Sequence, residues 1–300
     1  MLDSEVLMGL LESKGFSITD VPEDADTAIV NTCGFIEAAK EESIEMILRL
    51  AELKSEGRIS ALVVMGCLSQ RYPGEMLGQI SEIDAVFGTA DLAKIPDMLG
   101  ELGRGRRLSE VSPVPDYLYD GRTPRKLLTP QHSVYVKIQE GCSNRCSYCV
   151  IPDLKGPRRS RSISSVVAEV KALKSVYPVK ELMLIGQDTT SFGLDNPGRA
   201  LLPELIAEVS PLMEDGWVRL LYTHPAHFSD ELIGVISGTP NVCRYVDLPI
   251  QHINDRILDA MNRRVSRADI ESLLDRVREG IDDVTIRTSV IVGFPGETEK

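Results

Sequence analysis

Three cysteines, Cys142, Cys146 and Cys149, lie close together in the segment EGCSNRCSYC with the spacing C-x₃-C-x₂-C. Three thiols so near in sequence converge only from a loop, and thiolates are the ligands of iron–sulfur clusters and of zinc. An iron–sulfur cube usually takes four cysteines, so three would leave one iron open to another ligand. The spacing therefore predicts a 4Fe–4S cluster with an open iron.

Two other interpretations of these cysteines stay open. Zinc would need a fourth ligand, and the sequence offers His132, before the preceding strand, or Cys243, far along the chain. The thiols could also be unligated. The predicted strand at 133–138 ends just before the cysteines, and (β/α) folds place their chemistry at the carboxyl ends of strands. This position favours the cluster.

A second pair of cysteines, Cys33 and Cys67, directly follows two further predicted strands, in IVNTCGF and VVMGCLS. In a parallel sheet those positions share the carboxyl edge, where ligands bind. The pair could hold a metal group, or could be two unrelated small core residues. The sixth cysteine, Cys243, precedes a predicted strand, so we expect a buried structural thiol there.

The composition limits the kinds of protein that are compatible with these cysteines. The chain has 300 residues, 43% of them hydrophobic, and a net charge of −12. The length predicts two domains, and the acidic charge disfavours a broad nucleic-acid surface. We find neither a transmembrane run nor a signal peptide, so we expect a cytoplasmic location. In the reducing cytoplasm, cysteines are more often metal ligands or catalytic groups than partners in disulfides.

The elements that position Cys33 and Cys67 alternate between strand and helix. Strands are expected at 27–30, 61–65 and 84–87, and helices at 3–14, 37–54, 70–80 and 90–102. The alternation predicts an α/β domain over residues 1–102, built on a doubly wound parallel sheet. Residues 103–131 contain four prolines and a polar DGRTPRK stretch, which predicts a linker.

A second alternating series follows and would position the three clustered cysteines. Its strands are expected at 133–138, 181–185, 217–222, 244–248 and 284–292, with the clearest helices at 163–175 and 266–279. Repeated β–α units of this spacing predict a partial (β/α) barrel over residues 132–300. The first domain opens on a helix with no strand before it, and the barrel stops early, so we expect a fragment.

The motif C-x₃-C-x-Y-C at the end of the first strand of a β/α series resembles the radical S-adenosylmethionine superfamily. The resemblance implies a partial barrel of that type, whose open iron binds the amino and carboxylate groups of S-adenosylmethionine. It also implies that Tyr148 packs near the adenine. Gly186, Gln187 and Asp188 lie at the place of the family's Gly-Gly-Glu motif, which implies contact with the cofactor's methionine amino group.

Three histidines of the second domain, His224, His227 and His252, each lie at the end of a predicted strand near this chemistry. Histidine serves in catalysis and in metal binding, but it is also common as a hydrogen-bonded structural residue. We expect the structural role for all three, and the sequence assigns no catalytic residue.

An α/β domain with Cys33 and Cys67, joined to such a barrel, resembles the plan of the methylthiotransferases. In that family an auxiliary 4Fe–4S cluster takes three cysteines, the first in a Gly-Cys segment just before Val-Asp-Ser-Glu. This chain starts Met-Leu-Asp-Ser-Glu. The resemblance therefore implies that Cys33 and Cys67 are two of the ligands, that the third and the first strand are absent from this chain, and that the C-terminal TRAM domain is absent too.

Four longer stretches resemble the branch of this family that modifies an aspartate of small-subunit ribosomal protein twelve; they lie at 31–45, 141–162, 186–193 and 248–258. The implied activity is methylthiolation of the aspartate β-carbon. S-adenosylmethionine would be radical source and methyl donor, and the auxiliary cluster would deliver sulfur. The implied partners are that ribosomal protein and an electron donor, without a membrane or a required nucleic acid. The alternatives are the transfer RNA adenosine branch and a non-enzymatic zinc-binding module.

Overall fold

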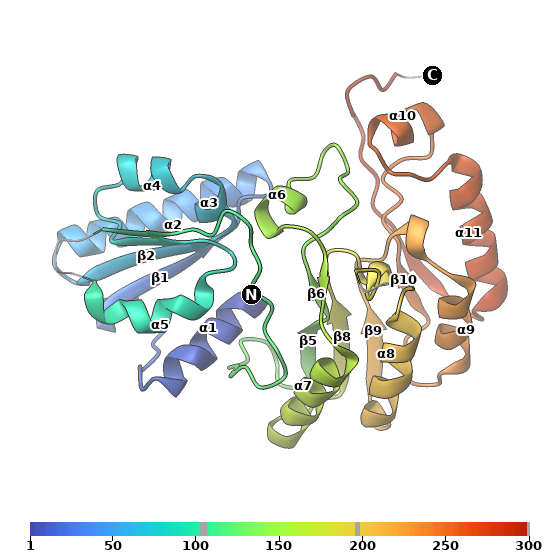
Figure 1. The fold of residues 1–300 in the computed structure, drawn as a ribbon, viewed down its shortest axis with the longest axis horizontal. Helices are drawn as coiled ribbons and strands as arrows, with labels where there is room; N and C mark the ends of the chain where they lie inside the picture. Colours follow the sequence, from blue (N-terminus) through green and yellow to red (C-terminus); the bar gives the residue numbers. More distant parts are fainter. Residues whose placement is uncertain (103–106, 196–198, 299–300) are drawn as a thin grey trace. The chain divides into compact units, whose positions relative to one another are not determined.

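A computed structural model describes residues 1–102, 107–195 and 199–298 of the chain. The chain divides into two compact units, each built from several segments. The first unit comprises Met1–Tyr119, Thr123–Leu128 and Asp153–Gly156, and the second comprises Asp120–Arg122, Thr129–Pro152 and Pro157–Lys300. Each unit has its own sheet and its own covering helices (Figure 1).

The first unit is built on a four-stranded parallel sheet in the order β1-β2-β3-β4. Its strands are β1 (Thr27–Thr32), β2 (Ala61–Gly66), β3 (Ala85–Phe87) and β4 (Leu108–Glu110). Every residue of β2 is buried, as expected for a central strand that is covered on both faces. The predicted α/β class with a parallel sheet is confirmed.

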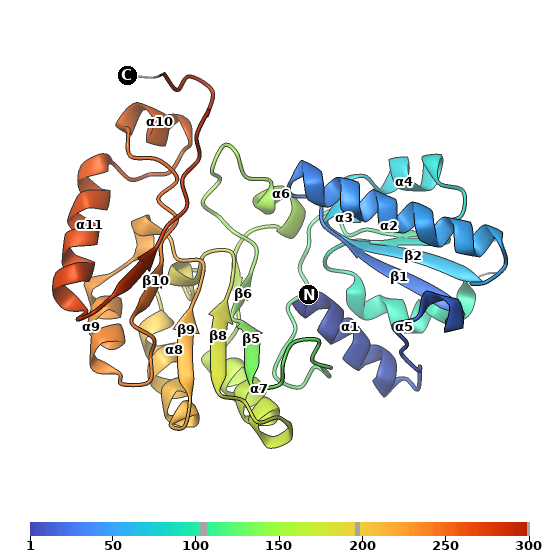
Figure 2. The same ribbon diagram turned by 180° about the vertical axis from the view of Figure 1, so that it is seen from behind.

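Helices cover both faces of this sheet. They are α1 (Leu2–Ser13), α2 (Glu37–Ser55), α3 (Cys67–Arg71), α4 (Pro73–Gln79) and α5 (Ile95–Met98). Figures 1 and 2 show α2, α3 and α4 on one side and α1 and α5 on the other. Ile47 and Leu50 of α2 belong to one buried cluster with Leu62 and Val64 of β2. Each such side chain contributes about 1.5–3 kcal/mol by its burial.

Three predicted stretches of the first unit differ from the structure, and prolines explain two of them. The helix expected at 70–80 is split between α3 and α4 at Pro73, and the one expected at 90–102 is interrupted around Pro96. Proline lacks the N–H that a helix interior needs, so it begins a helix instead. The stretch interpreted as a linker contains β4, which pairs with β3. Residues 103–106 of that stretch lie outside the described residues.

The second unit is a series of β/α units. Its parallel strands are β5 (Ser133–Lys137), β8 (Glu181–Ile185) and β9 (Trp217–Leu220), followed by the parallel pair β10 (Tyr245–Asp247) and β11 (Thr285–Arg287). Helices α7 (Ile163–Val176), α8 (Leu202–Val209), α9 (Asp230–Gly238) and α11 (Arg267–Gly280) cover one face of these strands (Figure 2). This arrangement is a partial (β/α) barrel.

Short elements complete the second unit near the carboxyl ends of its strands. They are β6 (Gln139–Glu140), which pairs antiparallel with β7 (Arg159–Ser160), then α6 (Ile151–Lys155), whose last residues belong to the first unit, and α10 (Asp255–Ala260). Strands β9 and β11 are shorter than expected. Past β9, Tyr222 has a left-handed backbone with φ 58°. No helix in the described part of the chain is both long and apolar enough to cross a membrane.

Three segments of the first unit are held together by polar contacts. The buried Glu5 carboxylate of α1 accepts hydrogen bonds from Arg125 Nε at 2.8 Å and from the Leu128 backbone N–H at 2.9 Å. The Thr89 hydroxyl donates to the Leu154 carbonyl at 2.8 Å. Residues 123–128 and 153–156 are therefore parts of this unit, although they follow its sheet in sequence.

Candidate functional site

The three clustered cysteines lie in the loop between β6 and α6, and all three are half-buried. The Cys149 backbone N–H donates to the Cys146 carbonyl at 3.0 Å, which turns the loop back on itself. Burial raises the pKa of the Cys142 thiol, and so do the Asp188 carboxylate and the thiols of Cys149 and Cys146. The loop thus brings the three cysteines within electrostatic reach of one another.

The spread of these thiols distinguishes them from a compact single-ion site. Within the described residues, the set of three metal-binding side chains whose ligand atoms all lie within 4.8 Å of one another is Asp188, His224 and His227. The three thiols are spaced more widely than that. A tetrahedral zinc ion with Zn–S bonds of about 2.3 Å would bring its sulfur ligands to about 3.8 Å from one another.

A turn that follows α10 is hydrogen-bonded to the cysteine loop. The Ser147 backbone N–H donates to the Met261 carbonyl at 3.0 Å, and the Ser147 hydroxyl donates to the Ala260 carbonyl at 2.8 Å. The Asn262 side-chain amide donates to the Arg145 carbonyl at 2.8 Å. Arg145 and Asn262 both have left-handed backbones, with φ 55° and 54°. The two turns therefore fix each other's conformation.

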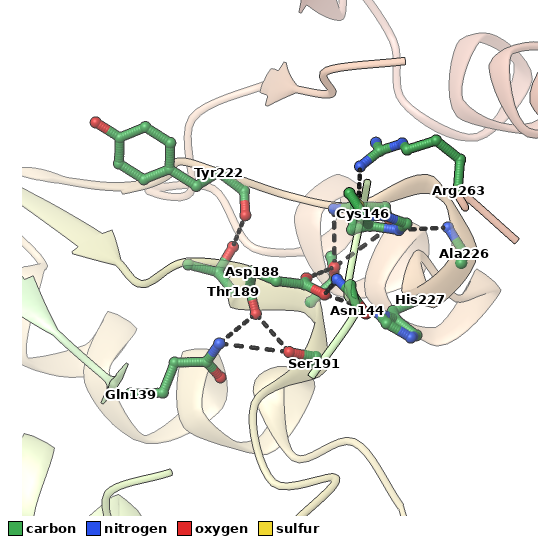
Figure 3. A network of polar contacts seen from close by, with 12 residues as sticks. Gln139, Asn144, Cys146, Asp188, Thr189, Ser191, Tyr222, Ala226, His227 and Arg263 are labelled. Carbon is green, nitrogen blue, oxygen red and sulfur yellow. Dashed lines mark hydrogen bonds and ion pairs between the residues drawn. The ribbon is translucent and has the colours of Figure 1, made fainter. Parts of the chain in front are cut away.

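Arg263 in the same turn reaches the cysteines directly. Its side chain is buried, and Nη1 donates to Cys146 Sγ at 3.5 Å (Figure 3). Its Nη2 donates to the Pro249 carbonyl at 2.6 Å. Burial raises the pKa of the Tyr148 hydroxyl well above its ordinary value, although the positive charge of Arg263 opposes this rise. A buried guanidinium therefore lies against the cysteine loop.

Asp188, just after β8, is fully buried, and both of its carboxylate oxygens are engaged. Oδ1 accepts from the Thr190 hydroxyl at 2.6 Å, and Oδ2 lies 2.8 Å from both Asn144 Nδ2 and His227 Nδ1 (Figure 3). Burial alone would raise the pKa of this carboxyl. The His227 hydrogen bond, the neighbouring His224 and the Thr190 hydroxyl instead hold it well below its ordinary range. Since Asn144 belongs to the cysteine loop, Asp188 ties that loop to β8.

His224 lies beside the Asp188 carboxylate, and one of its two ring nitrogens makes no hydrogen bond to the described residues. Its Nδ1 accepts from the Ala226 backbone N–H at 3.2 Å, while its buried Nε2 has no partner within the described part of the chain. Burial, followed by the charge of Arg263, lowers the pKa of His224 to about 3. The imidazole is therefore neutral at physiological pH.

Gly186 and Gln187, also predicted from sequence, lie at the carboxyl end of β8. A Cβ on Gly186 would come 2.8 Å from Cγ of Gln139, so the close approach of that side chain requires glycine. Gln187 Nε2 donates to Glu140 Oε1 at 2.8 Å. The Oε1 atoms of Gln139 and Gln187 are buried and lack a donor among the described residues. Such amide oxygens would accept hydrogen bonds from an ammonium group.

Cys33 and Cys67 lie at the carboxyl edge of the first unit's sheet. Thr32 and Gly66, the last residues of β1 and β2, are register partners, and each cysteine comes one residue later. Cys33 is exposed and Cys67 is half-buried. A Cβ on Gly34 would lie 2.9 Å from the Cys67 backbone, so the two loops approach closely. The pair shares one edge; its role as ligands stays a prediction.

Two other predicted residues lie in separate surroundings. The backbone N–H of Cys243, before β10, donates to the Val218 carbonyl, and burial raises the pKa of its thiol. His252 Nε2 lies 3.4 Å from Glu297 Oε1, and its Nδ1 accepts from the Asn254 backbone N–H. Cys243 is half-buried, which is less than the sequence predicted, and a structural role for Cys243 and His252 stays a prediction.

Sequence reasoning missed Asn144 and Arg263. Asn144 lies inside the cysteine motif and could have been noticed as a side chain able to hold the loop. Arg263 lies 117 residues beyond its contact Cys146, and no spacing rule connects the two.

Comparison with known families agrees with this geometry. Residues 136–300 match the family described as the Radical SAM superfamily, and residues 1–88 match one described as Uncharacterized protein family UPF0004. The fold and the cysteine loop thus define a radical S-adenosylmethionine protein. Curated relatives named "Ribosomal protein uS12 methylthiotransferase RimO" are 48% identical in Heliobacterium modesticaldum and 47% identical in Desulforamulus reducens, over all of this chain. The chain belongs to this RimO family.

The chain spans 65% of the length of the Heliobacterium relative and 67% of the Desulforamulus relative. Among solved structures it is similar to the radical S-adenosylmethionine methyltransferase TsrM from Kitasatospora setae, with a TM-score of 0.66 and 17% identity over 99% of this chain and 65% of that one. It is also similar to the cobalamin-dependent radical enzyme OxsB, with a TM-score of 0.55 and 11% identity over 96% of this chain and 42% of that one. These two similarities concern the fold alone.

Proposed function

We propose that this chain carries the radical-generating part of an enzyme that methylthiolates the β-carbon of an aspartate in ribosomal protein uS12. The observation that carries the proposal is the loop of three cysteines at the carboxyl ends of a partial (β/α) barrel. The name of the curated relatives supports uS12 as the substrate. The net charge of −12 also suits a basic protein substrate better than RNA.

The donor set fits a 4Fe–4S cluster held by Cys142, Cys146 and Cys149. Their thiols are more widely spaced than the ligands of one ion, as expected for sulfurs that bind separate irons of a cube. Three ligands leave one iron for S-adenosylmethionine. Cys142, Cys146 and Cys149 would hold the cluster, which would supply one electron for the reductive cleavage of S-adenosylmethionine. The protein orients that cofactor and excludes water.

The residues near β8 would have different roles in binding S-adenosylmethionine. The buried Oε1 atoms of Gln139 and Gln187 lack donors, and the cofactor's amino group would supply them. Gly186 leaves room beside Gln139, and Tyr148 lies next to the cysteines to pack against the adenine. Both oxygens of Asp188 are already engaged, so it holds the cysteine loop through Asn144 instead of contacting the cofactor.

The first unit would carry the auxiliary cluster that delivers sulfur. Cys33 and Cys67 lie at the ends of paired strands and would be two of its three ligands. A second S-adenosylmethionine would donate the methyl group, and an electron donor would reduce the radical cluster. The reaction would take place in the cytoplasm, where ribosomal proteins are found.

Anaerobic reconstitution with iron and sulfide tests the radical site. We expect about four irons bound at the triad and release of 5′-deoxyadenosine from S-adenosylmethionine after chemical reduction. A colourless protein that takes up only zinc would contradict the proposal and favour a zinc-binding module.

The substrate is tested in cells that lack the intact enzyme. Mass spectrometry should show uS12 without its methylthio group and transfer RNA with its methylthio adenosine unchanged. The opposite pattern would assign the chain to the transfer RNA branch.

A further inference from the structure

We propose that Arg263 sets the reduction potential of the cluster held by the cysteine loop, acting as a buried cation against Cys146. This inference rests on the proposed function, since it requires that the triad binds the cluster. It assigns a positioning role to a residue that lies outside every cysteine motif of the sequence.

The contacts of Arg263 fix the position of its charge. Only 5% of the residue is exposed, and the guanidinium is held between Cys146 Sγ at 3.5 Å and the Pro249 carbonyl at 2.6 Å. The third nitrogen, Nε, is also buried and has no partner in the described parts of the chain. Among the described residues no carboxylate oxygen lies within ion-pair distance of the Arg263 guanidinium, so no salt bridge neutralises its charge.

The turn that carries Arg263 is itself fixed on the cysteine loop. The neighbouring Asn262 donates to the Arg145 carbonyl, and the Ser147 N–H donates to the Met261 carbonyl. Neither of these contacts involves the guanidinium of Arg263. The turn can therefore stay in place when the side chain of Arg263 is changed, which separates the effect of the charge from the effect of the turn.

Charges of opposite sign flank the triad. Arg263 lies at Cys146, while the Asp188 carboxylate accepts a hydrogen bond from Asn144 of the same loop. The field of Arg263 reaches beyond its direct contacts, because its charge helps to lower the pKa of His224. A buried charge acts more strongly than an exposed one, since less solvent screens it.

The consequence for reduction follows from the sign of the charge. A one-electron reductant of the reduced-flavin class transfers one electron to the cluster and is itself oxidised by one. The cluster becomes more negative by one charge. A nearby cation and a hydrogen bond to a ligand sulfur stabilise this reduced form, so they raise the potential. Removal of Arg263 should therefore lower the fraction reduced by a given donor.

The test compares the wild-type chain with R263Q, R263K and R264Q after anaerobic reconstitution. R264Q is the matched control, because it removes an equal charge from the next residue, which is exposed. Each protein is titrated against a defined solution potential with sodium dithionite and redox mediators, and the reduced cluster is counted by electron paramagnetic resonance. Iron content and the melting curve of the apoprotein report whether the fold is kept.

In R263Q we expect the ratio of reduced to oxidised cluster at a fixed potential to fall about tenfold, or about 59 mV for one electron. R263K should stay within about threefold of wild type, since it keeps the charge, and R264Q should be unchanged. An unshifted R263Q with full iron content overturns the proposal. So does loss of the cluster in both Arg263 variants, which would mean a structural role.

If only R263Q fails to take up iron, R263K decides. A wild-type ratio of reduced to oxidised cluster at a fixed potential supports the proposal, and a ratio lowered tenfold or more overturns it. A wild-type chain that binds no cluster at all would instead contradict the proposed function.

Discussion

The cysteine loop at 142–149 and the pair Cys33 and Cys67 both lie at carboxyl edges of parallel sheets, but they are assembled differently. One loop supplies all three thiols of the first site. The pair comes from two strands, and only the register between them brings the cysteines to one edge. A site formed by one loop can be predicted from the spacing of its residues in the sequence. A site formed by the ends of two strands can be predicted only if the strand order is known.

The two sites also differ in what holds them. Side chains from distant segments fix the cysteine loop, namely Asp188 through Asn144 and Arg263 through Cys146. The pair is held by close backbone packing, with Gly34 against Cys67 and Gly66 against Thr32, and by a hydrogen bond from the Cys33 backbone N–H to the Ser43 hydroxyl at 3.1 Å. The loop should therefore respond to changes of Asp188 and Arg263, and the pair to changes of Gly34 and Gly66.

The largest expected effect is from Cys142→Ala. Loss of one of three ligands should abolish S-adenosylmethionine cleavage, measured as 5′-deoxyadenosine released by the reconstituted, reduced chain. Cys33→Ala and Cys243→Ala should leave the rate within about twofold, because neither lies on the loop proposed to hold the radical cluster. An equal loss in Cys33→Ala would break the distinction between the two sites.

The second-largest effect is expected from Asp188→Asn. It removes the buried charge and presents an N–H₂ group to Asn144, His227 and Thr190, which already donate to this residue. We expect about 3 kcal/mol of lost stability in the second unit and reduced iron uptake. Urea denaturation and iron analysis measure the two effects. Asp215→Asn, at an exposed position, is the control and should change neither the stability nor the iron uptake. An Asp188→Asn protein as stable as wild type would mean that the hydrogen bond between Asp188 and Asn144 does not hold the cysteine loop.

Gly66→Ala tests the backbone of the other site. The glycine has φ 107°, and a Cβ would lie 2.5 Å from the Thr32 carbonyl oxygen. We expect a loss of about 2–3 kcal/mol in the unfolding free energy of the first unit. Gly57→Ala, with φ 74° but open space around the Cβ, should cost only about 1 kcal/mol. Equal losses would show that the close approach of β1 and β2 is unimportant.

The smallest effect concerns the acid stability of the second unit. His224 has a pKa of about 3 in the folded chain against 6.5 unfolded, so the unfolded chain binds the proton first. The stability it contributes is present above pH 6.5 and is lost as the pH falls toward 3, by up to about 1.4 kcal/mol per pH unit. Asp188, whose pKa is also lowered, adds a loss of the same sign at lower pH.

His224→Gln should therefore flatten the decrease in stability between pH 7 and pH 5. Urea denaturation can be followed by the fluorescence of Trp217, the single tryptophan, which lies in β9 of this unit. An unchanged slope would mean that His224 does not stay unprotonated in the folded chain.

Much of the fold could be predicted, because hydrophobic periodicity and turn residues are local signals. The helix at 37–54 and the strands at 61–65 and 181–185 agree with α2, β2 and β8 within about one residue. Strand β4 was missed because three residues between prolines and charges carry too little pattern. Its place in the sheet comes from its pairing with β3, which is a tertiary property.

The candidate site was predictable only as far as its motifs extend. The cysteines and Gly186 stand in recognisable segments. The clamp between Asp188 and Asn144 and the contact of Arg263 with Cys146 join residues 44 and 117 positions apart. Such contacts depend on which strand and helix ends meet at one edge, and local pattern does not encode that.

The path of the chain between the two units has a consequence for how the protein is made. Residues 129–152, which include the cysteine loop, leave the first unit after Leu128 and return to it at Asp153. The first unit cannot be completed on the ribosome until residue 156 has emerged, and by then the whole cysteine loop has been synthesised. Both ends of residues 129–152 are then already fixed in place. The cysteine loop therefore has less conformational entropy left to lose when it binds a metal. A cut at 131 would separate Asp3 from its partner Lys155 and leave the first unit unfinished.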